Sequence, residues 1–307
     1  MNQSHDRLDV LAIGVMVGLC ALWGLNQVAV KVANGGISPV LQAGLRSAGA
    51  AALLWAWSSA RGVRLFERDG SFGLGMLIAA LFSAEFATLY WGLEFTTASR
   101  AVLFLYLSPF VVAIGAHAFI PGERLRARHL IGLTAAFAGM ALAFADALRL
   151  PGHRELLGDA LVTAAAILWG ATTVVIKATR LVRLSADKTL FYQLTGSAAL
   201  LIALSFALGE RGFFAPSPLV LAAFAYQLVI IAFASYLTWF WLITRYPAFK
   251  LSAFSFLTPL FGLIAGGVLL SEPITPALAS ATALVAVGIY LVNRTPPARP
   301  AMAGAGN

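Results

Sequence analysis

The chain has 307 residues, a net charge of +8, 60% hydrophobic residues and only 11% charged residues. Ordinary soluble domains contain roughly 45–50% apolar and about 25% charged residues. The composition therefore excludes a water-soluble fold and predicts an all-α integral membrane protein. Basic residues lie in short clusters between apolar runs rather than along one face, which argues against nucleic acid as a partner and indicates membrane topology.

Taking about 20 apolar residues as one crossing of the bilayer, the sequence predicts ten transmembrane helices, with nine as the alternative count. The predicted spans are 10–30, 39–60, 72–92, 99–119, 128–147, 158–177, 187–208, 218–243, 248–270 and 276–293. No polar stretch between them is long enough for a separate soluble domain. The tail 295–307 is rich in Pro, Ala and Gly and is predicted to be disordered.

Lys and Arg accumulate in the cytoplasmic loops of membrane proteins. With the N-terminus inside, fifteen of the 21 Lys and Arg residues fall on the cytoplasmic side and five on the opposite side, while Arg46 lies within a span. This distribution predicts that both termini and the tail are cytoplasmic and that the number of spans is even.

The two halves of the chain repeat each other. Leu22-Trp23-Gly24 returns 146 residues later as Leu168-Trp169-Gly170, and Leu107-Ser108-Pro109 returns 150 residues later as Leu257-Thr258-Pro259. The slowly drifting offset indicates a duplication into residues 1–148 and 149–294. Each copy has five predicted spans, an odd number, so the repeats should be inverted in the membrane. Inverted repeats recur in secondary transporters, whose substrate site lies between them and whose access alternates.

Three stretches together resemble the EamA-type, ten-helix branch of the drug/metabolite transporter superfamily. They are the repeated Leu-Trp-Gly, residues 94–100 before the fourth span, and the Leu-Ser/Thr-Pro motifs whose continuations end at Glu123 and Glu272. The second continuation departs from the pattern because it lacks the Gly before Glu. More narrowly, the chain is similar to YddG-type amino-acid exporters of bacterial inner membranes.

The resemblance implies a multi-pass secondary transporter that exports amino acids, aromatic and other apolar ones among them, with protons as candidate coupling ions. A broad drug or metabolite exporter and a passive channel remain as alternatives. The sequence contains no Walker-type phosphate loop and no HExxH or GxSxG motif. Its four histidines have no ligand spacing, so no enzyme activity, cofactor or metal is predicted.

Polar and aromatic residues on the first helix of each half are candidates for a substrate cavity. Trp23 and Gln27 share a helix face and Asn26 is adjacent, while the second half presents Trp169 and Thr173 in the same spacing. Amides are costly in lipid unless they find a polar partner or a wet cavity. The alternative is that these residues only pack and hydrogen-bond neighbouring helices.

Glu85 lies near the middle of the third apolar run, where an ionised carboxylate costs several kcal/mol or more unless it is paired or solvated. We expect it to bind a substrate ammonium or to hold a proton exchanged with substrate; a structural pair with Arg46 is the alternative. Tyr106, Tyr236 and Trp239 are predicted to supply an aromatic pocket in the same cavity.

Pro109 and Pro259 lie deep in the fourth and ninth spans, where each removes a backbone hydrogen bond. They are predicted hinges for gating, with tolerated kinks as the alternative. Glu123, beside Arg124 at the end of the fourth span, is predicted to cap a helix or form an ion pair.

Overall fold

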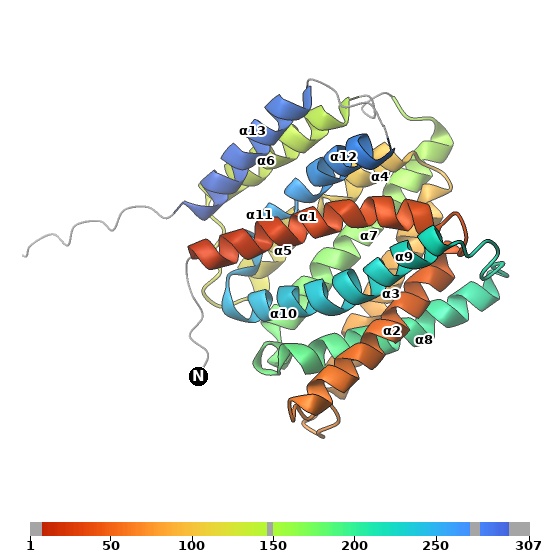
Figure 1. The fold of residues 1–307 in the computed structure, drawn as a ribbon. Helices are drawn as coiled ribbons and strands as arrows, with labels where there is room; N and C mark the ends of the chain where they lie inside the picture. The colour runs from red at the N-terminus through yellow and green to blue at the C-terminus, as the bar shows by residue number, and fades with distance from the viewer. Residues whose placement is uncertain (1–7, 146–149, 271–276, 295–307) are drawn as a thin grey trace, which may run out of the picture.

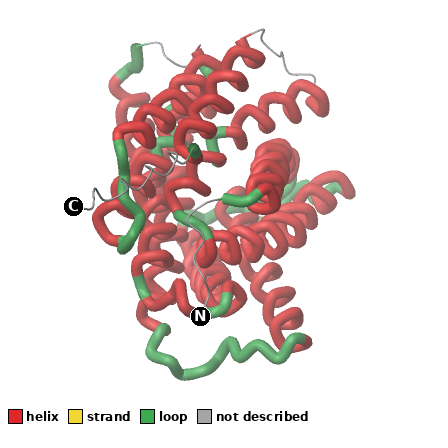
Figure 2. Tube along the Cα trace, turned by 90° about the vertical axis from the view of Figure 1, so that its left-hand side faces the viewer, coloured by secondary structure: helices red, strands yellow, loops and turns green. Residues whose placement is uncertain are grey.

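The computed structural model describes residues 8–145, 150–270 and 277–294. The predicted tail 295–307 and Glu272 lie outside these residues. Within the described ranges the chain is helical and contains no strand, apart from one isolated bridge between Ile37 and Phe213 (Figure 2). The all-helical fold expected from the sequence is confirmed.

The first half of the chain contains α1 (Val10–Ala33), α2 (Pro39–Ala60), α3 (Phe72–Leu93), α4 (Ala98–Leu105), α5 (Ser108–Phe119) and α6 (Ala127–Ala143). The second half contains α7 (His153–Ala178), α8 (Ala186–Ala207), α9 (Pro218–Tyr226), α10 (Tyr236–Arg245), α11 (Ala248–Phe254), α12 (Leu257–Leu270) and α13 (Ala277–Asn293). A short 3₁₀ turn follows α7 at Arg180–Arg183, and a π-helical segment, Gln227–Ser235, joins α9 to α10.

Seven helical segments of the described chain are long and apolar enough to cross a membrane. They are α1, α3, α4 with α5, α7, α8, the continuous run Pro218–Arg245, and α11 with α12. α6 and α13 are apolar but shorter, and α2, which carries Arg46, meets neither description. The chain is therefore a multi-pass membrane protein.

The helices form one bundle with a distinct pair at each edge (Figure 1). α6 and α13 run side by side at one edge, and α2 packs against α8 toward the other. Between these pairs, α1 packs against α9 and α12, while α7 packs against α3 and α5. α1 and α7 each therefore contact helices of the opposite half.

Glycines bring α6 and α13 into backbone contact. A Cβ atom added at Gly288 would lie 2.5 Å from both the amide nitrogen of Ala136 and the carbonyl oxygen of Gly132. One added at Gly139 would lie 2.8 Å from the carbonyl oxygen of Ala281. Small residues let helices approach closely in membranes, where association depends on packing and not on exclusion of water. The α6–α13 pair is held in this way.

Gly288→Ala should therefore destabilise the protein by about 1–3 kcal/mol, because the methyl group forces the two backbones apart. Gly14→Ala is the matched control, since a Cβ added on that part of α1 meets nothing within 4 Å. Thermal unfolding of both variants in detergent checks the prediction. Equal stability of the two variants would contradict the packing role of Gly288.

Two crossings are interrupted just before their prolines. α4 ends at Leu105 and α5 begins at Ser108, with Pro109 in its first turn. α11 ends at Phe254 and α12 begins at Leu257, with Pro259 in its first turn. Proline is accepted at a helix start because the amide it lacks would have no partner there. Both predicted hinges thus lie at real breaks, while their part in gating stays a prediction.

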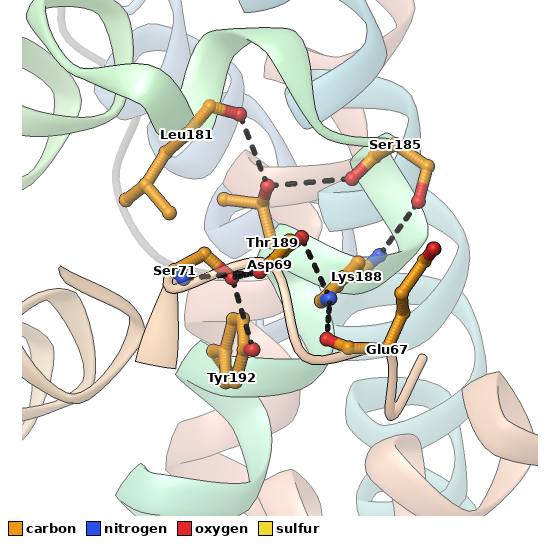
Figure 3. A network of polar contacts seen from close by, with 8 residues as sticks. All are labelled: Glu67, Asp69, Ser71, Leu181, Ser185, Lys188, Thr189 and Tyr192. Atoms are coloured by element: carbon orange, nitrogen blue, oxygen red, sulfur yellow. Dashed lines mark hydrogen bonds and ion pairs between the residues drawn. The ribbon is translucent and has the colours of Figure 1, made fainter. Parts of the chain in front are cut away.

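The connection between α2 and α3 is tied to the start of α8 (Figure 3). The Lys188 ammonium donates to the backbone oxygen of Glu67 at 2.6 Å and to the Asp69 carboxylate at 2.8 Å. Hydrogen bonds to Asp69 from Lys188 and then from Ser71 hold the pKa of this carboxyl well below its usual range. Tyr192 continues the network through a 3.0 Å contact with the Ser71 hydroxyl. Asp69 therefore stays ionised at neutral pH and this loop stays attached to α8.

Candidate functional site

Two aromatic pairs join helices of the bundle. On one side the rings of Trp23 and Trp239 meet edge to face with centroids 5.7 Å apart, which links α1 to α10. On the other side Tyr106 and Trp169 meet in the same way at 5.9 Å, which links the break after α4 to α7. Edge-to-face pairs at these separations are favourable contacts. The structure thus brings four of the predicted site residues together as two pairs.

Trp23 also forms a polar contact with the π-helical segment. Its indole nitrogen donates to the Ser235 hydroxyl at 3.0 Å, and that hydroxyl donates to the backbone oxygen of Ile231 at 2.6 Å. π-helical turns are rare and frequently occur at functional sites, because they re-aim side chains along a helix. Tyr236, which follows Ser235 at the start of α10, packs against Phe82 of α3 with ring centroids 6.3 Å apart.

Glu85 and Arg46 are charged residues buried in the bundle. Glu85 is 7% exposed, and its Oε2 has no hydrogen-bond partner among the described residues. Arg46 is 3% exposed, and its Nε and Nη2 likewise have no partner within the described ranges. Its guanidinium lies 5.1 Å from the ring centroid of Phe86, the residue after Glu85.

The two charges interact electrostatically, and Arg46 also interacts in this way with Tyr90 and Tyr236. Arg46 and Glu85 form no ion pair or hydrogen bond with each other in the described chain. The structural pair that the sequence offered as the alternative role of Glu85 is therefore not formed.

The three other residues predicted to line the cavity differ in their surroundings. Asn26 keeps a buried Oδ1 atom without a partner in the part of the chain described here. Thr173 is 4% exposed. Gln27 is exposed, and its amide lies beside Gly262 of α12. Trp23 and Gln27 do share a helix face, but Trp23 faces α10 and Gln27 faces α12.

Two surface hollows lie away from these residues. One, of about 310 Å³, is lined by residues that include Arg61, Asp187 and Trp241. The other, of about 430 Å³, lies over the last turns of α2 and the residues that follow it, from Trp55 to Glu67. Neither includes any of the nine residues expected to line the substrate cavity.

Polar contacts tie several helices together at the end of the bundle where α1 begins. Lys177, at the end of α7, donates to the backbone oxygens of Ile243 and Tyr246 at 2.6 and 2.7 Å. The Tyr246 hydroxyl donates to Asp9 at 2.9 Å, and Asp9 caps α1 by accepting from the amide of Ala12. We call Asp9, Glu123, Lys177 and Tyr246 the clasp.

Glu123 completes the clasp from the connection between α5 and α6. Its carboxylate accepts from the backbone amides of Ala248 at 3.0 Å and Phe249 at 3.4 Å, at the start of α11. One of its oxygens lies 3.9 Å from the Lys177 ammonium. Burial raises the pKa of Glu123, while the amides and Lys177 oppose that rise. The capping or pairing predicted for Glu123 is confirmed, and both occur.

A buried ion pair fixes the opposite end of the bundle. Arg100 of α4 binds both carboxylate oxygens of Asp159 on α7, with its Nε 3.2 Å from Oδ1. The Thr96 hydroxyl donates to the same carboxylate at 2.8 Å. Both charged residues are at most 5% exposed. Arg100 was predicted to lie at the start of the fourth span, 99–119, and no sequence pattern indicated its partner, 59 residues away.

A multi-pass helical bundle with helix breaks, buried unpaired charges and polar ties at its ends has the features of a membrane transporter. Comparison with known proteins agrees with this class. The family model described as the EamA-like transporter family matches the chain twice, over residues 10–145 and 156–294. The chain belongs to the EamA-like transporter family, and it is a transporter rather than an enzyme. The resemblance to this family seen in the sequence is confirmed.

Curated relatives match over nearly their whole length. The "Uncharacterized transporter YvbV" of Bacillus subtilis is 27% identical over 293 residues, which covers 93% of this chain and 92% of that protein. A "Probable amino-acid metabolite efflux pump" of Escherichia coli is 28% identical over 294 residues, covering 92% and 93%. One crystal structure superposes with a TM-score of 0.78 at 24% identity, covering 90% of this chain and 94% of that one. At this identity the superposition shows the fold alone.

Reasoning from the sequence missed several residues around Glu85. Phe82 and Phe86 are common apolar residues in a long apolar helix and carried no signal. Arg46 did carry a signal, because it is a charge within an apolar run, but the sequence offered it only as the structural partner of Glu85. Ser235, the repeat equivalent of Glu85, carried no signal in the sequence as the acceptor for Trp23.

Proposed function

We propose that this chain is a secondary transporter that exports amino acids, aromatic and other apolar ones among them, across the bacterial inner membrane by alternating access. In this proposal ten crossings form two inverted repeats, residues 1–148 and 149–294, and both termini face the cytoplasm. The substrate is held between the repeats by the nine predicted cavity residues, and protons are the candidate coupling ions. The observation that carries the proposal is Glu85, a buried carboxylate with an unpartnered oxygen among aromatic rings.

Reciprocal contacts support the inverted repeat. Under the duplication α1 corresponds to α7 and α12 to α5, and the contact of α1 with α12 has its counterpart in the contact of α7 with α5. The glycines agree in detail: a Cβ added at Gly24 would lie 2.6 Å from the Cβ of Phe261. One added at the equivalent Gly170 would lie 2.7 Å from the Cβ of the equivalent Val111.

The asymmetry of the repeats favours a role for Glu85 in binding. The position equivalent to Glu85 is Ser235, which is occupied in the hydrogen bond from Trp23. By the same relation, the counterpart of the Trp23–Ser235 contact would join Trp169 of α7 to Glu85 of α3, and these two helices pack together. A carboxylate held there can bind an ammonium group, while the neighbouring rings suit an apolar side chain. The Escherichia coli relative is named as a probable amino-acid metabolite efflux pump, which supports a cargo of this kind.

Efflux from proteoliposomes tests the proposal. Purified protein in liposomes loaded with labelled phenylalanine, threonine or lysine should give saturable efflux above that of protein-free liposomes. We expect Glu85→Gln to lower that efflux by about tenfold or more, because one charged contact with the substrate is lost. Glu94→Gln is the matched control, since Glu94 is exposed at the end of the same helix. A proton gradient should change the rate in the wild type more than in Glu85→Gln if Glu85 exchanges a proton.

Three other outcomes would point elsewhere. Flux that never saturates and ignores substrate on the far side would identify a passive channel. Efflux of apolar drugs without efflux of any amino acid would favour the broad drug exporter, which the same aromatic residues suit. Unchanged efflux by Glu85→Gln would remove Glu85 from the working site.

A further inference from the structure

Arg46 is a buried cation, and one hydrogen-bonding edge of its guanidinium has no partner among the described residues. Nε and Nη2, the two nitrogens without a partner in the described chain, lie side by side on one edge of the guanidinium. That edge presents two parallel N–H groups, which match the two oxygens of a carboxylate. A buried donor pair left without acceptors is costly. The geometry is therefore that of a carboxylate receptor.

Phe86 orients this receptor. The guanidinium carbon lies 5.1 Å from the centroid of the Phe86 ring, so the aromatic ring occupies one side of the cation. Phe86 is itself held by a ring contact with Phe82 at 4.9 Å and another with Tyr90 at 6.0 Å. A guanidinium held in this way keeps a fixed direction for its free edge. Arg46 is thus oriented by contacts that leave the edge itself without an acceptor.

Glu85 supplies the complementary charge one residue from Phe86. It interacts electrostatically with Arg46, yet the two form no ion pair in the described part of the chain. Among the described residues, Tyr90 and Tyr236 also interact electrostatically with Arg46, and phenol groups are ordinarily neutral at pH 7. The site therefore offers one cation, Arg46, and one carboxyl group, Glu85, that can carry the opposite charge. A ligand that carries both charges on neighbouring atoms would satisfy both groups at once.

We propose that Arg46 binds the carboxylate of the transported amino acid through Nε–H and Nη2–H, while Glu85 binds its ammonium group. This rests on the proposed function, and it names the cargo more narrowly as a zwitterion with free carboxylate and ammonium groups. Phe82 and Tyr236, in contact with each other, lie where an apolar side chain would pack. Arg46 becomes a residue that determines specificity for amino acids over amines.

Three ligands of similar shape separate the two roles. Phenylalanine carries both charged groups, phenylethylamine lacks the carboxylate, and 3-phenylpropionate lacks the ammonium. Binding to purified protein can be followed by calorimetry and by intrinsic tryptophan fluorescence. For Arg46→Gln we expect the affinity for phenylalanine to fall roughly 10- to 150-fold, as for a lost hydrogen bond to a charged group. The affinity for phenylethylamine should stay at the wild-type value. Glu85→Gln should show the converse, weakening phenylalanine and leaving 3-phenylpropionate unchanged.

Two further variants and one further ligand serve as controls. Arg64→Gln removes the same charge from an exposed loop position and should bind all three ligands as the wild type does. Arg46→Lys keeps the charge but lacks the paired edge, so an intermediate loss for phenylalanine is expected. If Arg46→Gln does not fold, Arg46→Lys and the wild type still decide. The wild type should bind phenylalanine methyl ester much more weakly than phenylalanine.

The outcomes distinguish this proposal from the function on which it rests. Suppose that the wild type binds phenylalanine and that Arg46→Gln either binds it equally well or loses affinity for phenylalanine and phenylethylamine alike. Arg46 is then not a carboxylate receptor, while the proposed amino-acid transport stands. Equal affinity of the wild type for phenylalanine and its methyl ester would also overturn the role of Arg46 as a carboxylate receptor. If the folded wild type binds no amino acid at all, both proposals fail.

Discussion

Asp159→Ala is expected to destabilise the protein by about 3–5 kcal/mol, because it takes the carboxylate partner from a guanidinium that stays buried. Arg100 is 5% exposed and binds both oxygens of Asp159, so the variant must bury the cation without this compensation or rearrange α4 and α7. The apparent melting temperature in detergent should fall by on the order of 10 °C. Expression in the membrane should fall with it.

Asp187→Ala provides the matched comparison. Asp187 is 7% exposed, similar to Asp159, but its basic partner Arg61 has a side chain that is 55% exposed and lies 3.9 Å away. Released from Asp187, Arg61 can be solvated, so the loss should be about 1 kcal/mol or less for the ion pair. The double variant Arg100→Met, Asp159→Leu should recover most of the stability lost in Asp159→Ala. Equal destabilisation by the two alanine variants would show that the burial of the basic partner does not set the cost.

Lys177→Met is expected to open the clasp and to increase the population of the form accessible from that end by about 10- to 150-fold. The variant removes two charge-assisted hydrogen bonds, to Ile243 and Tyr246. The loss of one such bond costs about 1.5–3 kcal/mol, which corresponds to this factor, so the factor is a lower bound for the pair. Cys20 can report the change because it is the single cysteine of the chain. It is buried on α1, and its thiol donates to the backbone oxygen of Phe254. Its reaction with a maleimide should accelerate by the same factor.

Lys188→Met is the control for this measurement. Lys188 is also buried and also donates to a backbone oxygen, but its contacts attach the loop between α2 and α3 to α8, outside the clasp (Figure 3). Its Cys20 reactivity should match that of the wild type. With the orientation proposed above, a membrane-impermeant maleimide should label Lys177→Met from the cytoplasmic side only. Labelling from the opposite side would contradict that orientation, and unchanged labelling would contradict the clasp as a gate.

The clasp has a part in the proposed transport cycle, because it joins the two halves of the chain at one end of the bundle. An exporter must expose its substrate site to one side of the membrane at a time, and inverted-repeat transporters do so by rocking one unit against the other. The clasp connects α1, α7, α11 and the connection between α5 and α6, which belong to both halves. Breaking it would free the helices that carry Trp23 and Trp169. The helix breaks before Pro109 and Pro259 are where such motion would concentrate.

Composition and motifs alone predicted the class of this protein. Most residues of the chain are apolar, which places it in lipid. A helical membrane fold follows, because every backbone amide must be satisfied within the protein there. The repeated Leu-Trp-Gly and Leu-Ser/Thr-Pro motifs pointed to the family, because local sequence is conserved where a duplication keeps the same packing role. Glu85 stood out for the same physical reason, as a charge in an apolar run.

The sequence by itself thus determined that the protein lies in a lipid bilayer, that it is helical, which family it belongs to and that it buries a carboxylate. Only the tertiary structure decided which groups those residues meet. Arg46 and Glu85 come together from different helices without pairing, Asp159 reaches Arg100 across 59 residues, and Glu123 reaches the start of α11 across 125 residues. Such partners depend on how helices pack in three dimensions. Periodicity tells which face of a helix is buried but not which helix will cover it.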